Sequence, residues 1–240
     1  TQSRSSAASD VYKRQLPPQP AKYVGQALAQ RFTQVSQVFV NLAYPLVFEQ
    51  LQGEHPQRAR LVASLAAHLL GEGMSSPLVD TVRERLGLAY TAYAAMEGGD
   101  VWANFIVHAV TTPDKLEALV AATGGLLRAQ AAGIDLVHLE RAKNQLAVSR
   151  VRAGERTYAT MERAVEDLFA HGSVTSVAET LAMIDGIGAE EVRKVFERML
   201  AHPPAVAITG KGASARTVRQ LAAGLACLLY TSPSPRDQRG

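Results

Sequence analysis

Alternating apolar and polar positions predict strands in four stretches of the chain. The clearest is residues 32–44, where every second position from Val38 to Tyr44 is apolar or aromatic. Two later runs are joined by the turn at 97–100 and predict an antiparallel hairpin. The predicted strands cover residues 32–44, 88–96, 101–110 and 203–210.

Apolar residues three or four positions apart predict helices in most of the remaining chain. Leu61, Leu65 and Leu69 show this spacing most clearly. Ser76 and Pro77 suit the start of the next helix, because serine caps a helix and proline lacks the N–H that would be left unbonded there. The predicted helices cover residues 57–70, 77–86, 112–133, 135–154, 155–171, 176–184, 189–201 and 214–225.

The order of these elements indicates an α+β fold. A strand, two helices, a hairpin, a run of helices and a last strand predict an antiparallel sheet with helices packed on one side. Strands and helices do not alternate regularly, which argues against a doubly wound parallel sheet. About 210 residues that are nearly half apolar are enough to bury one core.

The two ends of the chain read as translated sequencing adapter. One codon choice for the segment from Asp10 to Gln15 has a reverse complement that encodes the segment from Cys227 to Ser232 in another frame. Such segments are set aside in fold reasoning. We expect adapter-derived tails at both ends and a single domain between them, at residues 1–15, 227–240 and 16–226 respectively.

The charge balance is neutral once these tails are set aside. The whole chain has 25 Lys and Arg against 22 Asp and Glu, and residues 16–226 hold 20 of each. A neutral domain gives no support for binding nucleic acid or a membrane surface, and no apolar run is long enough to span a membrane. The single cysteine, Cys227, lies in a tail, so the domain has neither a disulfide nor a thiolate metal site. The composition does not indicate a compartment.

The six histidines do not form a metal-binding pattern. No H-x-x-E-H or H-E-x-x-H motif occurs, and no two histidines lie four residues apart. His68 and Glu72 have helical spacing but no third ligand nearby, and His108 alternates with apolar strand residues as a structural histidine would. A G-x-S-x-G elbow and a phosphate loop are also absent from the sequence. We therefore predict no metal site and no cofactor in this chain.

An arginine and a tyrosine flank a tight corner in VRERLGLAYTAY (82–93). Arg83 and Tyr90 are seven residues apart, and a solvated helix face followed by a half-buried strand would explain them without any function. The longer stretch LLGEGMSSPLVDTVRERLGLAYTAYA (69–94), however, resembles the second-domain signature of the insulinase/pitrilysin family of zinc peptidases, which includes the mitochondrial processing peptidases. In that signature L-G-G-G-M-S-S-R-L leads into V-R-E-K-x-G-L-A-Y. The resemblance continues through ERAKNQL and PAVAITG, at residues 140–146 and 204–210.

The resemblance implies a fold and a set of site residues. Such enzymes have two related α+β domains of the LuxS/processing-peptidase type, and the first domain carries H-x-x-E-H and the zinc. The second contributes an arginine and a tyrosine, which match Arg83 and Tyr90 as residues that stabilise the substrate and the transition state. The glycine-rich loop would add substrate contacts from Gly73, Ser75 and Ser76. Pro77 departs from the pattern, because many relatives have arginine there.

The function implied by the resemblance is that of half an enzyme. The chain would be the substrate-binding C-terminal half of a zinc metalloendopeptidase, inactive without the H-x-x-E-H domain. Zinc would come from that missing domain or from a partner subunit, and the substrate would be a peptide or an unfolded polypeptide. The alternative is a non-catalytic structural or core subunit of the same fold, like those of respiratory complexes.

Overall fold

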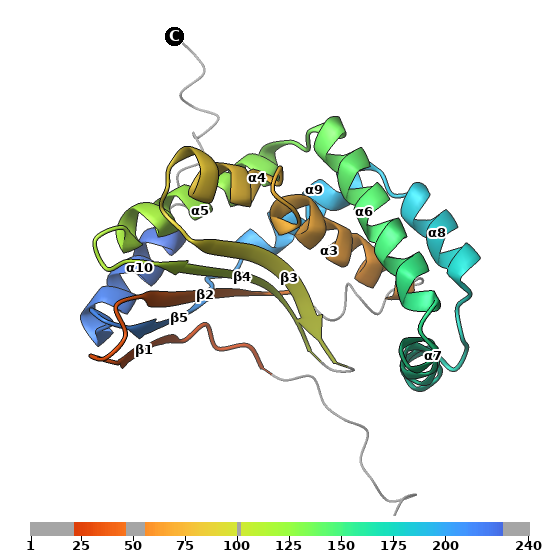
Figure 1. Ribbon diagram of the computed structural model, residues 1–240, viewed down its shortest axis with the longest axis horizontal. Coiled ribbons are helices and arrows are strands. Elements are labelled where there is room, and N and C mark those ends of the chain that lie inside the picture. Colours follow the sequence, from red (N-terminus) through yellow and green to blue (C-terminus); the bar gives the residue numbers. More distant parts are fainter. Residues whose placement is uncertain (1–21, 47–55, 100–101, 228–240) are drawn as a thin grey trace, which may run out of the picture.

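The computed structural model describes residues 22–46, 56–99 and 102–227, which form a sheet covered by helices (Figure 1). Five strands lie in the order β1-β5-β2-β4-β3. The strands are β1 (Ala27–Arg31), β2 (Val38–Pro45), β3 (Thr91–Gly98), β4 (Ala103–Thr111) and β5 (Ala205–Gly210). The helices are α3 (Pro56–Gly71), α4 (Pro77–Val79), the π-helix η1 (Asp80–Arg85), α5 (Leu116–Ala132), α6 (Leu136–Gly154), α7 (Thr157–His171), α8 (Val177–Asp185), α9 (Ala189–Leu200) and α10 (Ala215–Cys227).

Strand β2 is the centre of the sheet. It pairs antiparallel with β4 on one side and with β5 on the other, and β3 and β4 form the predicted hairpin. The exception to antiparallel pairing is β1, which runs parallel to β5 with Ala27 opposite Val206. The sheet is therefore antiparallel apart from one edge pair.

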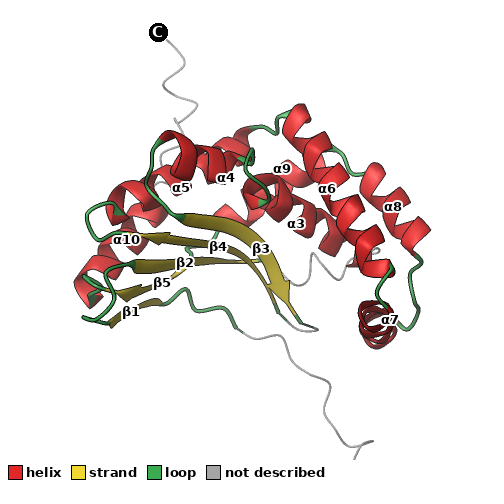
Figure 2. Ribbon diagram, in the orientation of Figure 1, coloured by secondary structure: helices red, strands yellow, loops and turns green. Residues whose placement is uncertain are grey.

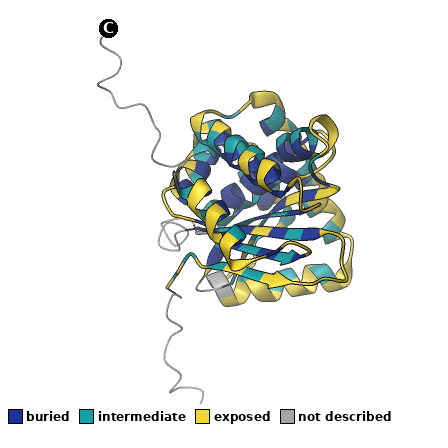
Figure 3. Ribbon diagram, turned by 90° about the vertical axis from the view of Figure 1, so that its left-hand side faces the viewer, coloured by how far each residue is buried: buried dark blue, intermediate teal, exposed yellow. Residues whose placement is uncertain are grey.

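The helices cover one face of the sheet (Figure 2). Burial alternates along the strands: Val40 and Leu42 are buried toward the helices, whereas Asn41 between them is exposed. Across the layers, Phe105 of β4 meets Phe196 of α9 edge to face, with ring centroids 5.5 Å apart. Buried residues concentrate between the sheet and the helices (Figure 3). This arrangement confirms the predicted α+β fold with helices on one side.

Three features of the sheet differ from the sequence prediction. Strand β2 begins at Val38 instead of residue 32, because the residues between β1 and Val38 form turns. Strand β1 was not predicted, because its sequence ALAQR has no β-branched or aromatic residue to mark a strand. Strand β3 begins at Thr91 instead of residue 88, because the preceding residues form a connector from η1. Residues 16–21 of the predicted domain and almost all of both predicted tails lie outside the described residues.

Helix α3 ends directly against strand β3. A β-carbon placed on Gly71 would lie 2.2 Å from the backbone nitrogen of Ala94 and 2.8 Å from its Cβ. These distances are far below van der Waals contact, and a backbone atom cannot move aside as a flexible side chain can. Glycine is therefore required at residue 71 for the helix to approach the strand so closely.

We expect Gly71→Ala to lower the free energy of unfolding by about 1–3 kcal/mol or more, because the added methyl group overpacks this contact. The matched control is Gly125→Ala in α5, where the nearest atom to an added Cβ is Arg128 Nη2 at 3.9 Å. Since alanine favours a helix over glycine, this control should gain up to about 1 kcal/mol. Urea unfolding of both variants measures the two changes, and an unaltered midpoint for Gly71→Ala would contradict the proposed contact.

Candidate functional site

Arg83 lies beyond a helix start that the local sequence determines. The N–H of Val79 donates to the side-chain oxygen of Ser76 (3.4 Å), and Pro77 occupies the first turn. These positions confirm the predicted cap. Ser76 is fully buried. Its hydroxyl is therefore used by the helix and is not presented to a ligand on the surface.

After this start the helix widens into the π-helix η1. The N–H of Leu86 donates to the carbonyl oxygen of Thr81, five residues earlier (3.0 Å), and such π-turns are rare and frequent at functional sites. Arg83 lies in this turn with 43% of its side chain exposed, and its Nε is 3.2 Å from Glu84 Oε1. An exposed ion pair of this kind is weak, so the guanidinium is free to exchange Glu84 for a ligand.

A hydrogen-bonded corner brings the chain back after η1. The carbonyl oxygen of Val82 accepts hydrogen bonds from the N–H groups of both Leu88 (2.7 Å) and Ala89 (3.0 Å). Val82 immediately precedes Arg83, and Ala89 immediately precedes Tyr90. Standard backbone dimensions then place the α-carbons of Arg83 and Tyr90 within roughly 10 Å of each other.

Contacts from the β4–α5 connection hold this corner in place. Gly87 has φ +56°, a left-handed conformation that allows the chain to reverse. Lys115 Nζ donates to the carbonyl oxygen of Gly87 (2.8 Å), and Thr111 Oγ1 donates to that of Leu88 (2.6 Å). The corner is thus fixed by tertiary hydrogen bonds as well as by its own backbone.

Tyr90 lies at the edge of this corner, one residue before β3. Its N–H donates to the carbonyl oxygen of Val110 (2.9 Å), which anchors the backbone to β4. Its side chain is 78% exposed. The structure therefore places Arg83 and Tyr90 on the two arms of one corner, each with a donor group at the surface.

The glycine-rich loop between α3 and α4 is held by helix α6. Arg141 Nη1 donates to the carbonyl oxygen of Ser75 and, at 3.1 Å, to its side-chain oxygen, while Nη2 donates to the carbonyl oxygen of Leu69 (3.2 Å). Gly73 packs against the same helix, because a β-carbon there would lie 2.8 Å from Gln145 Nε2. The loop of Gly73 and Ser75 is thus fixed at both ends by one guanidinium.

Arg141 is a site-supporting residue that the sequence patterns did not single out. It lies in the ERAKNQL segment of the family resemblance, but nothing in that segment shows which carbonyl oxygens its guanidinium meets. Burial lowers the pKa of Arg141. The three hydrogen bonds described above nonetheless suit a charged guanidinium.

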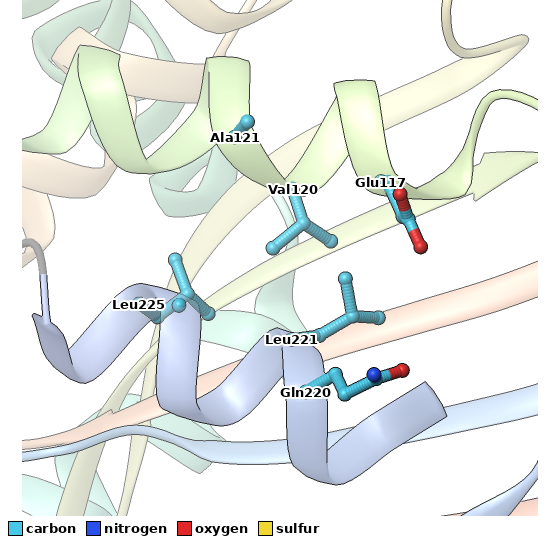
Figure 4. Close-up of a pocket in the computed structure, with 7 residues that line it drawn as sticks. Glu117, Val120, Ala121, Gln220, Leu221 and Leu225 are labelled. Carbon is cyan, nitrogen blue, oxygen red and sulfur yellow. The ribbon is translucent and has the colours of Figure 1, made fainter. Parts of the chain in front are cut away.

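The hollows of the described surface include two that Arg83 and Tyr90 do not line. An apolar one of about 320 Å³ lies between α5 and α10, where Val120, Leu221 and Leu225 meet (Figure 4). A more polar one of about 550 Å³ lies between α3 and α6, lined by His68, Glu72, Asn144, Gln145, Val148, Ser149, Arg152 and Arg156. Arg83 and Tyr90 themselves lie at the surface, as their exposed fractions show.

The described residues contain no group of three or more His, Cys, Asp or Glu side chains that could hold a metal ion. His108 is instead part of the open face of the sheet: its Nδ1 is 2.9 Å from Asn41 Oδ1, and its ring lies on that of Tyr93 with centroids 4.9 Å apart. Burial lowers the pKa of His108, so its imidazole is neutral at pH 7. None of the described helices is long and apolar enough to cross a membrane.

We expect Arg141→Ala to loosen the glycine-rich loop, because three carbonyl or hydroxyl contacts to α6 are lost together. The backbone N–H groups of Glu72 and Ser76, which are bonded in the structure, should exchange with deuterium faster, by roughly tenfold for each 1.4 kcal/mol of protection lost. Lys143→Ala is the matched control, since Lys143 lies on the same helix but donates to the carbonyl oxygen of Asp185. Equal exchange in both variants would show that Arg141 does not hold the loop.

Known proteins resemble this chain both in sequence and in fold. An uncharacterized zinc protease of Mycobacterium tuberculosis is 30% identical over 165 residues, which cover 67% of this chain and 37% of that protein. One from Streptomyces coelicolor is 32% identical over 142 residues, or 59% of this chain and 31% of that protein. The chain thus spans about a third of the length of the curated relatives it matches.

Solved structures share the fold at lower sequence identity. A peptidase M16 inactive domain from Pseudomonas fluorescens superposes with a TM-score of 0.63 at 20% identity, over 81% of this chain and 45% of that chain. A chain of complex III2 from Candida albicans, solved with Inz-5 bound, gives 0.71 at 15% identity, over 85% of this chain and 50% of that chain. The family described as Peptidase M16 inactive domain matches residues 4–146, more than half of the sequence. The chain therefore belongs to the Peptidase M16 inactive domain family of zinc proteases.

Proposed function

We propose that residues 16–226 are the substrate-binding half of a zinc metalloendopeptidase, and that the zinc-binding half lies in another domain or subunit. The observation that carries the proposal is the corner at Val82, which holds Arg83 and Tyr90 close together with both side chains exposed. A scaffold has no need of two exposed donors at such a corner. A peptidase site does need them, because it must bind a peptide carbonyl group and the oxyanion derived from it.

The two side chains have complementary roles in this proposal. The Arg83 guanidinium presents several fixed N–H donors and a permanent charge, which suit a peptide carbonyl group before and during reaction. The Tyr90 hydroxyl presents one neutral donor, which gains most when negative charge develops on the carbonyl oxygen. Zinc bound to the other domain would supply the activated water that attacks the peptide bond.

The glycine-rich loop would form one wall of the substrate site. Gly73 and Ser75 are exposed, and the Arg141 guanidinium bonds the carbonyl oxygens of Ser75 and Leu69, so the loop can offer backbone groups to an extended peptide without rearranging. Ser76 contributes to this wall indirectly, because its buried hydroxyl caps the helix that carries Arg83. Such a preformed wall lowers the entropy lost when the substrate binds.

The second candidate function is a structural subunit. The complex III2 chain shares this fold, with a TM-score of 0.71 at 15% identity. Identity this low is informative about the fold only, so the similarity does not choose between the two functions. Peptide cleavage by the full-length, zinc-bound protein does choose, since a structural subunit would cleave no peptide.

We expect Tyr90→Phe to reduce kcat by roughly 10²–10³-fold in the full-length peptidase with zinc bound, the usual effect of removing one oxyanion donor. KM should change little, because the lost hydrogen bond belongs to the transition state. Tyr93→Phe is the control, since Tyr93 lies three residues further along and its ring is stacked on His108. Turnover of Tyr90→Phe close to that of Tyr93→Phe would show that the Tyr90 hydroxyl is not an oxyanion donor.

Arg83→Ala should raise KM as well as lower kcat, because the guanidinium binds the peptide before reaction as well as in the transition state. Arg85→Ala is its control: Arg85 lies on the same π-helix, is also exposed, and faces Asp80 at 4.0 Å. Steady-state kinetics on one peptide substrate separates the two parameters. If both variants behaved alike, general surface charge and not the position of Arg83 would explain the effect.

A further inference from the structure

Helix α7 presents its apolar face to solvent. Its large apolar and aromatic side chains are three, four or seven positions apart, which places them on one side of the helix. Their exposed fractions are 70% for Tyr158, 56% for Met161, 46% for Val165, 55% for Leu168 and 83% for Phe169. We call these five residues the α7 face.

The opposite side of α7 is small or charged. Ala159, Arg163, Ala164 and Asp167 are its partly buried positions, and no described side chain of α7 belongs to the hydrophobic core. Arg150 of α6 lies close to this side of α7. Its burial and the nearby charge of Arg163 both lower its pKa. The orientation is thus the reverse of that expected for a surface helix, whose apolar side normally faces its own domain.

A continuous apolar stripe of this size on a surface helix indicates an interaction site. The α7 face is rich in the aromatic residues and methionine that are enriched in the centres of protein interfaces. None of the described residues covers the α7 face, since the contact with α6 uses the inner side of the helix. The stripe therefore needs a partner from outside the described chain.

We propose that the α7 face docks onto the zinc-binding domain of the same peptidase. This inference rests on the proposed function, which requires a second domain to be held against the Arg83–Tyr90 corner. The relative from Mycobacterium tuberculosis is matched over only 37% of its length, so most of such a protease lies outside the region that this chain represents. A covalently linked domain also has a high effective concentration at this surface.

The position of α7 suits a second point of attachment. Strand β3 starts beside the corner and runs toward the end of the molecule where α7 lies (Figure 1). Its eight residues span about 26 Å at the usual rise of a strand, and a domain of about 200 residues is roughly 40 Å across. A domain of this size is longer than β3 and could extend past its end toward α7, and two separated contacts would fix its orientation over the Arg83–Tyr90 corner.

Hydroxyl-radical footprinting tests the docking without depending on catalysis. In the full-length peptidase, labelling of Tyr158, Met161 and Phe169 should fall about tenfold relative to this domain alone, as for residues at the desolvated centre of an interface. Sedimentation of the same sample shows whether the protein is a single copy. Full labelling overturns the proposal, and so does protection that appears only in a dimer, since a second copy would then be the partner.

A charge on the α7 face gives the second measurement. After specific cleavage between the two domains, Leu168→Asp with Phe169→Asp should weaken their association at least about tenfold, since loss of an interface hot spot has this effect. The control is Val137→Asp, which alters an equally exposed apolar residue (77%) at the start of α6. If the zinc domain stays bound as tightly to the double variant as to the control, the α7 face is not the docking surface.

The two proposals fail in different ways. An inactive full-length protein whose α7 face is protected in a single copy would contradict the peptidase function and leave the docking intact. An active peptidase in which this face is fully labelled would retain the function and disprove the docking.

Discussion

The candidate site depends on one carbonyl oxygen, that of Val82. It accepts two backbone N–H groups from the far side of the corner and so converts a separation of seven residues along the chain into a short distance in space. The side chain of Val82 is fully buried, which fixes the position of this carbonyl group relative to the core. Because the last turn of the helix is a π-turn and Gly87 adopts φ +56°, the chain can return without a longer loop.

The corner has little freedom to adjust because neighbouring elements also hold it. Lys115 and Thr111 bond the carbonyl oxygens on its outer side, and the N–H of Tyr90 is bonded to β4. On the other arm, the Arg141 guanidinium fixes the loop that leads into α4. Groups placed in advance on such a rigid support need little reorganisation when charge develops on a substrate, which is the main electrostatic advantage of an enzyme site.

Local patterns were enough to predict most of the fold. Residues spaced by two or four identified β2 and α3, and Ser76 and Pro77 marked a helix start that the structure confirms. Strand β1 could not be predicted, because it is defined by parallel pairing with a strand that lies far away in the sequence. The same reason applies to the Arg141 contacts, since the acceptors of its guanidinium lie 66 and 72 residues away.

The open corner and the outward-facing α7 share a physical explanation. A chain that buries its core well, with Phe105, Phe196 and the central leucines fully enclosed, has no stability reason to leave five large apolar side chains of one helix in water. If Arg83 and Tyr90 are the proposed substrate donors, their exposed pair is likewise incomplete, because water competes for the donors until the site is covered. Both features are explained if one further domain covers the molecule from the corner to α7. The surface that binds this domain would then also shield the substrate from water.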